Sequence, residues 1–191
     1  LINNGIHPGE PDGIDATMQL FRDLALAKIK VPKNTIMATI PVYNIGGALN
    51  RNSTTRANQD GPESYGFRGN ARNYDLNRDF IKSDTKNTKS FYEIFHQLNP
   101  DVFIDNHVSN GADYQYKITY IMTQQNQLGS VLGNYLKTKM MPAIVTSLEQ
   151  KNLESTPYVN AFSETPDNGF AQFFDSPRYS TGYTSLFNTI G

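Results

Sequence analysis

The stretch Ile6-His7-Pro8-Gly9-Glu10 places a histidine and a glutamate three residues apart, between two segments of different periodicity. The apolar run that precedes it, residues 1–6, is typical of the end of a strand. After it, apolar residues recur at three- and four-residue intervals, which predicts a helix over residues 13–29. His7 and Glu10 would then lie at the carboxyl end of a strand, where open α/β sheets bind their ligands.

Composition limits the class of protein. The chain has 191 residues, 38% of them hydrophobic and 12% aromatic, which is typical of a globular fold with a sizeable core. Its net charge of -1 and the lack of a long basic run argue against nucleic acid or an anionic membrane as a partner. No apolar run approaches the roughly 20 residues of a spanning helix. Because cysteine is absent, any metal ligands must be His, Asp or Glu.

Strand-like and helix-like segments alternate along the chain. We predict a turn at Gly46-Gly47, strands at 35–43, 101–105 and 116–122, and helices at 13–29, 86–98 and 127–148, the last with Pro142 as a candidate break. Alternation of this kind favours an α/β fold. No linker or repeat interrupts it, so we expect one domain over residues 1–191. Between these elements, residues 48–73 are polar and irregular, which is usual for a functional loop.

A second histidine stands at the end of another predicted strand, because residues 101–105 lead directly into Asn106 and His107. A catalytic zinc site commonly takes three protein ligands and leaves one position open. His7, Glu10 and His107 could supply those three ligands. The alternative interpretation is structural. In it, His7 caps a helix, Glu10 is a first-turn carboxylate favoured by the helix dipole, and His107 is a turn residue.

Three motifs, taken in order, resemble those of the zinc carboxypeptidases, the carboxypeptidase A-like metallopeptidases. They are His7-Pro8-Gly9-Glu10, Asp75-Leu76-Asn77-Arg78 and Asp105-Asn106-His107. The resemblance implies a three-layer α/β domain, with a mixed, mostly parallel sheet of about eight strands flanked by helices. It also implies one Zn²⁺ per chain, held by His7, Glu10 and His107, and a peptide substrate with a free C-terminal carboxylate.

Further roles follow from the same resemblance. Asp75 would orient His7 through its other ring nitrogen. Asn77 and Arg78 would bind the substrate carboxylate, since a planar guanidinium takes a carboxylate bidentately. Arg68 would stabilise the oxyanion of the scissile carbonyl. Other residues are weaker candidates for the site: Arg72 as a competitor of Arg68, and Tyr179 and Tyr183 as residues that cap the bound substrate.

The sequence departs from the family pattern at the general base. A glutamate on a late strand should take the proton from the attacking water, but Glu149, Glu154 and Glu164 stand at a helix end or in a loop. We therefore expect the catalytic domain to be incomplete at both ends, with the base beyond Gly191. The alternative is a catalytically inactive relic that binds zinc and peptides.

Two other classes remain open at this stage. A zinc-dependent N-acyl-amino-acid deacylase, of the aspartoacylase and succinylglutamate desuccinylase type, resembles the carboxypeptidases in its ligands and its Asn-Arg pair. A structural α/β domain with accidental motifs would bind no metal. Family resemblance alone suggests an extracytoplasmic location, periplasmic or secreted. The sequence indicates neither the side-chain preference nor the oligomeric state.

Overall fold

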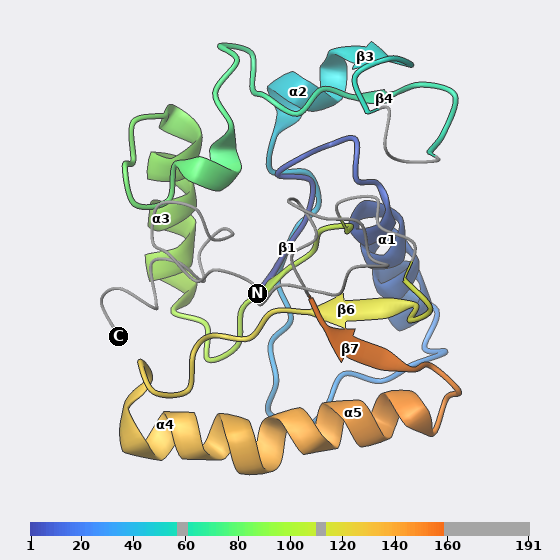
Figure 1. Cartoon of the computed structure of the whole chain (residues 1–191), viewed down its shortest axis with the longest axis vertical. Helices are drawn as coiled ribbons and strands as arrows, with labels where there is room; N and C mark the ends of the chain where they lie inside the picture. The colour runs from blue at the N-terminus through green and yellow to red at the C-terminus, as the bar shows by residue number, and fades with distance from the viewer. Residues whose placement is uncertain (57–60, 110–113, 159–191) are drawn as a thin grey trace, which may run out of the picture. The chain divides into compact units, whose positions relative to one another are not determined.

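A computed structural model describes residues 1–56, 61–109 and 114–158 of the chain (Figure 1). The chain divides into two compact units, Leu1–Val108 and Ser109–Gly191. Each unit is described by itself below. Among the described residues, none of the helices combines the length and the apolar character that a bilayer crossing requires.

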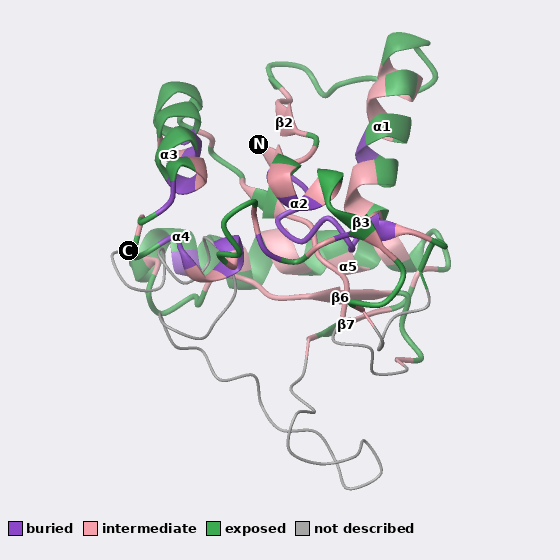
Figure 2. Cartoon of the chain, turned by 90° about the horizontal axis from the view of Figure 1, so that it is seen from above, coloured by how far each residue is buried: buried purple, intermediate pink, exposed green. Residues whose placement is uncertain are grey.

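The first unit contains a short parallel sheet with the strand order β2-β1-β5. In this sheet Ile2 of β1 (Ile2–Asn3) pairs with Thr39 of β2 (Thr39–Ile40) on one side and with Ile104 of β5 (Ile104–Asp105) on the other. Helices α1 (Asp12–Ala25) and α3 (Lys86–Leu98) lie on opposite sides of the sheet in both views (Figures 1 and 2). Parallel strands between two helices are the arrangement that an α/β fold requires.

Smaller elements lie beyond the carboxyl end of β1 (Figure 1). They are the short helix α2 (Ile45–Leu49), the antiparallel pair β3 (Arg51–Asn52) and β4 (Tyr65–Gly66), and a 3₁₀ turn, η1 (Leu76–Arg78). The predicted turn at Gly46-Gly47 is therefore wrong. The side chain of Asn44 accepts a hydrogen bond from Gly47 N at 2.9 Å, and this cap starts a helix where glycine propensity would not.

The second unit contains a parallel pair, β6 (Ile118–Tyr120) and β7 (Ser155–Pro157), joined through one long helical run. That run consists of α4 (Gly129–Tyr135), a π-helical turn (Leu136–Met140) and α5 (Met141–Glu149). Pro142 does not break it. The proline stands in the first turn of α5, directly after the π-helical turn, where a missing backbone N–H is tolerated.

The structure confirms a mixed α/β chain in which short parallel sheets are flanked by helices. It contains no single sheet of about eight strands within the described ranges, where seven strands of two or three residues form three separate sheets. The predicted strand at 35–43 contributes only Thr39–Ile40, because Pro41 cannot donate to a strand ladder. The predicted bounds of the helix at 86–98 are confirmed. A single domain over residues 1–191 stays a prediction.

An aromatic cluster forms the core beside α3. Buried positions, purple in Figure 2, gather around α2 and on α3. The rings of Tyr43, Phe80 and Phe91 lie 5.1–6.1 Å apart, centroid to centroid, in stacked and edge-to-face arrangements. Leu76 is fully buried as well. Because Leu76 and Phe80 flank Asn77 and Arg78, this core holds the loop that carries these two residues. Asn77 and Arg78 are the pair predicted to bind the substrate carboxylate, and we call them the predicted carboxylate clamp.

Asp79 anchors the same loop to the start of α3. Its buried carboxylate accepts hydrogen bonds from the hydroxyls of Thr85 and Thr88, at 2.7 and 2.6 Å, and from the backbone N–H of Asp84 and Thr85. Burial alone would raise the pKa of Asp79, but these hydrogen bonds hold it below its ordinary value. The ionised carboxylate is therefore the state that stabilises the fold.

We predict that Asp79→Asn lowers the free energy of unfolding by about 2 kcal/mol at pH 7, because charged hydrogen bonds to buried partners are lost. A depressed pKa gives stability that is present above the unfolded value, near pH 4, and is lost as the pH falls through the folded value. The difference between wild type and variant should therefore shrink between pH 6 and pH 3. Urea denaturation at each pH measures it. Exposed Asp84→Asn is the control, and a pH-independent difference would contradict the anchoring role.

Candidate metal centre

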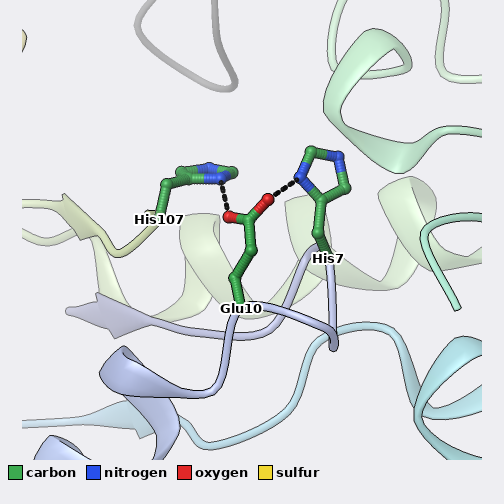
Figure 3. A group of neighbouring side chains, drawn as sticks. All are labelled: His7, Glu10 and His107. Atoms are coloured by element: carbon green, nitrogen blue, oxygen red, sulfur yellow. Dashed lines mark hydrogen bonds and ion pairs between the residues drawn. The ribbon is translucent and has the colours of Figure 1, made fainter. Parts of the chain in front are cut away.

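His7, Glu10 and His107 converge at the carboxyl end of the sheet in the first unit (Figure 3). One oxygen of the Glu10 carboxylate lies 2.8 Å from His7 Nδ1, and the other lies 3.1 Å from His107 Nδ1. One potential ligand atom from each residue lies within 4.8 Å of the other two. His7 and Glu10 are buried, and His107 is partly buried. The three side chains form a group that could hold a metal ion.

Two close approaches of the backbone assemble this corner. A turn closed by Glu10 N donating to His7 O, at 2.9 Å, leads into α1. A Cβ at Gly9 would lie 2.3 Å from Cδ of Arg56, so only glycine lets that side chain cross the turn. A Cβ at Gly13 would lie 2.4 Å from Cβ of Asn106, so α1 packs directly against the residue before His107. The Gly13 contact thus brings the start of α1, just after Glu10, against the segment that carries His107.

A carboxylate stands behind each imidazole. His7 Nε2 lies 3.0 Å from Oδ1 of Asp75, and His107 Nε2 lies 3.0 Å from Oδ2 of Asp105. Carboxylates in this position fix the tautomer and orientation of metal-binding histidines, leaving Nδ1 for the ion. The sequence reasoning had assigned Asp75 this role. It had missed Asp105, although an acidic residue two before the histidine, in Asp105-Asn106-His107, is the signal that could have found it.

The charges of the cluster shift one another's pKa. Burial would raise the pKa of Glu10, but hydrogen bonds with His107 and His7 hold it well below its usual range. Burial would likewise raise the pKa of Asp75, but His7 and Arg68 keep it far below its ordinary value. Burial alone would lower the pKa of His107, yet Asp105 and Glu10 raise it to about 10. The carboxylates of Glu10 and Asp75 are therefore held in their ionised form beside the imidazoles, and ionised carboxylates are the form that binds a metal ion.

The donor set suits a divalent metal ion. The two Glu10 oxygens lie 2.8 and 3.1 Å from the two Nδ1 atoms, one oxygen facing each histidine, and neighbouring donors of a tetrahedral site lie roughly 3.3 Å apart. Two imidazoles and one carboxylate are also a common protein ligand set for catalytic zinc. The geometry therefore establishes a possible metal site.

Two arginines border the cluster from different sides. Arg68 donates from Nε and Nη2 to Oδ2 of Asp75, at 3.0 and 2.9 Å, and its Nη1 lies 3.5 Å from His7 Nδ1. Arg56 donates from Nη2 to Oε1 of Glu10 at 3.0 Å, and its side chain is only 9% exposed. Sequence reasoning missed Arg56 because it lies in an irregular polar segment with no recognisable spacing to the motifs.

The predicted carboxylate clamp is joined to the cluster of His7, Glu10 and His107 through Asp75. The atom that faces His7, Oδ1 of Asp75, also accepts from Asn77 N at 3.0 Å. The side-chain Oδ1 of Asn77 is buried without a hydrogen-bond partner among the described residues. Arg78 is half-buried, and within the described part of the chain it has no acidic partner. Its Nη1 donates to Asn77 O at 2.9 Å.

Among the other predicted residues, Arg72 is not part of the cluster. Arg72 is exposed and lines a separate cavity beside α2. Tyr179 and Tyr183 lie outside the described residues, as does Glu164. Glu149 and Glu154 belong to the second unit, at the end of α5 and just before β7.

Comparison with known proteins found no matching family model, no matching curated protein and no matching solved structure. The chemistry of the site is therefore inferred from its own residues.

We predict that the full chain binds about one zinc per molecule and that His7→Ala and His107→Ala abolish stoichiometric binding. Asp105→Asn should weaken zinc affinity by roughly 10–100-fold, since it releases the His107 ring without removing a ligand. Competition against a chromogenic chelator measures the affinity, and elemental analysis measures the content. Asp101→Asn, on an exposed residue at the start of the same segment, is the matched control. Full zinc binding by both histidine variants would rule out this cluster as the site.

Proposed function

We propose that the protein is a zinc-dependent metallocarboxypeptidase, a hydrolase that removes the C-terminal residue of a peptide. One observation carries the proposal. Asp75 Oδ1 contacts both His7 Nε2 and Asn77 N, so a metal ligand and a carboxylate-binding loop meet at a single atom. A site that combines a hydrolytic metal with an arginine that has no acidic partner among the described residues suits a substrate whose reacting bond lies one residue from a carboxylate.

Each residue has a role in this proposal. His7, Glu10 and His107 would hold the zinc, which when bound polarises a carbonyl and lowers the pKa of water. Asp75 and Asp105 keep the two imidazoles oriented through their Nε2 atoms. Asn77 and Arg78 bind the substrate carboxylate and so fix which peptide bond lies at the metal. Positioning of this kind converts binding energy into a favourable reaction geometry.

The oxyanion role has two candidates. Arg68 is 45% exposed at its side chain and has Nη1 directed toward the His7 ring, so it can reach a substrate without leaving Asp75. Arg56 is buried against Glu10, where it neutralises a metal ligand. We therefore assign oxyanion stabilisation to Arg68 and the support of Glu10 to Arg56.

Turnover separates this proposal from its alternatives. No proton-accepting glutamate is assigned here among the described residues, so zinc and peptide binding without hydrolysis would favour an inactive relic. Hydrolysis of N-acyl amino acids in preference to hippuryl-type peptides would favour the deacylase. Zinc-dependent release of the C-terminal amino acid from hippuryl-type peptides, abolished by a chelator, is the expected result. The extracytoplasmic location stays a prediction.

We predict that Arg78→Ala raises KM for peptides with a free C-terminal carboxylate by roughly 10–100-fold, because a charged hydrogen-bonding partner is lost. Its zinc content should equal that of the wild type. Peptides amidated at the C-terminus should be poor substrates for both proteins. If the wild type cleaves amidated and free peptides equally well, Arg78 does not bind a terminal carboxylate.

We predict that Arg68→Ala lowers kcat by roughly 10²-fold with zinc content unchanged, as loss of one donor to a developing oxyanion does. Arg56→Ala should chiefly change zinc affinity, because its partner is the ligand Glu10. Steady-state kinetics and chelator competition on both variants measure the two effects. A loss of kcat in Arg56→Ala alone would transfer the oxyanion role to Arg56.

A further inference from the structure

A surface cavity of about 670 Å³ lies beside α2 in the first unit. Leu49 and Asn50 line it from α2 and its end, and Phe67, Arg72 and Asn73 line it from the loop that follows β4. The wall is thus part apolar and part amide, with one guanidinium. None of the lining residues is acidic.

Hydrogen bonds hold the loop that presents Arg72. The side-chain Oδ1 of Asn70 accepts from the backbone N–H of Arg72 and Tyr74, at 2.9 and 3.0 Å. The backbone of Asn70 donates to Tyr74 O and accepts from Asn73 N. Asn73 takes a left-handed φ of 62°, which asparagine tolerates. The side chain of Asn70 is therefore occupied by hydrogen bonds within the protein. These bonds hold the backbone of Arg72 in place beside the cavity.

Among the described residues that line the cavity, Arg72 alone is charged. Its guanidinium forms no ion pair within the described residues, and the side-chain amides of Asn50 and Asn73 donate to no group there either. A planar guanidinium flanked by amide donors matches a carboxylate, which it can take bidentately. A doubly charged phosphate would call for more cationic charge than one arginine provides.

The cavity wall is continuous in sequence with the metal centre. Phe67 directly precedes Arg68, and the lining loop ends just before Asp75. The two bonds from Arg68 to Asp75 close this loop at its base, beside His7. A peptide that is bound at the metal centre and continues along this loop could place a further side chain in the cavity, since an extended chain advances about 3.5 Å per residue.

We propose that this cavity is a subsite for an acidic side chain of the peptide substrate, on the N-terminal side of the cleaved bond. Arg72 binds the carboxylate, and Leu49 and Phe67 contact the aliphatic part of the side chain. This inference rests on the proposed function for its substrate, but binding of an acidic peptide to the cavity can be tested without turnover.

The binding test uses fluorescent alanine-based peptides, amidated at the C-terminus so that they do not depend on Arg78. Each peptide of the series carries a single glutamate, and its position varies from roughly two to five residues from the C-terminus, a range set by the reach of an extended chain. At one position the Glu peptide should bind the full-length protein about 10-fold tighter than its Gln counterpart, as for one charged hydrogen-bonded pair. Equal binding of Glu and Gln peptides at every position would overturn the proposal.

Variants locate the effect. Arg72→Gln should remove the preference for Glu, and Arg72→Glu should reverse it in favour of a Lys peptide. Lys89→Gln, an exposed cation on α3, is the matched control and should leave the preference unchanged. A preference for Glu that survives in Arg72→Gln overturns the proposal. So does inorganic phosphate competing better than N-acetylglutamate amide at equal concentration.

Kinetics separate this inference from the proposed function. With free-acid peptides, Arg72→Gln should raise KM for the Glu peptide by about 10-fold and leave kcat and zinc content unchanged. A fall in kcat instead would return Arg72 to the oxyanion role and overturn the subsite. If the wild type hydrolyses nothing but the Arg72-dependent preference for Glu persists in binding, the peptidase proposal fails and the cavity stands as an acidic-peptide site.

Discussion

The carboxylate of Asp75 is the contact on which the candidate site depends. Its Oδ1 faces His7 Nε2 and Asn77 N, and its Oδ2 receives two bonds from Arg68. One side chain therefore orients His7, a candidate metal ligand, starts the turn that carries Asn77, and holds Arg68, the arginine proposed for the oxyanion. Because all three contacts use the ionised form, the depressed pKa of Asp75 and the geometry of the site have the same cause. A carboxamide at this position would reverse the polarity of at least one contact.

Electrostatic balance explains why a cation belongs at this corner. Glu10, Asp75 and Asp105 bring three carboxylates close to the two imidazoles, and Glu10 is almost fully buried. Burying that much negative charge is unfavourable unless it is paired. Arg56, Arg68 and the imidazole of His107 face these carboxylates. A divalent ion bound by the cluster would supply part of that pairing.

Sequence alone could predict the convergence of His7, Glu10 and His107, because β1 and β5 are parallel neighbours and each histidine follows its strand. It could predict α3, whose ends are set locally by the caps Thr85 and Asn99. It could not predict the partners of Arg56 or Asp105, since these depend on how the β3–β4 hairpin and the β5 register place them. Nor could it predict the lengths of the strands, because Pro41 and the tertiary pairing limit the length of β2. Tyr179 and Tyr183 lie outside the described residues and stay predictions.

The two sides of the metal corner are held by different kinds of interaction. On the sheet side, Asn4 Oδ1 accepts from Thr17 of α1 and from Asn106, at 3.2 and 2.8 Å, and Asn4 Nδ2 donates to the backbone of Ile40. This neutral, buried network joins three elements and fixes where His107 stands relative to Glu10. On the loop side, the contacts are ionic, from Arg56 to Glu10 and from Arg68 to Asp75. The sheet therefore sets the positions of His7, Glu10 and His107 whatever the charge of the cluster. That charge governs how firmly the polar loops, which carry Asn77, Arg78 and the lining of the cavity beside α2, are held against the sheet.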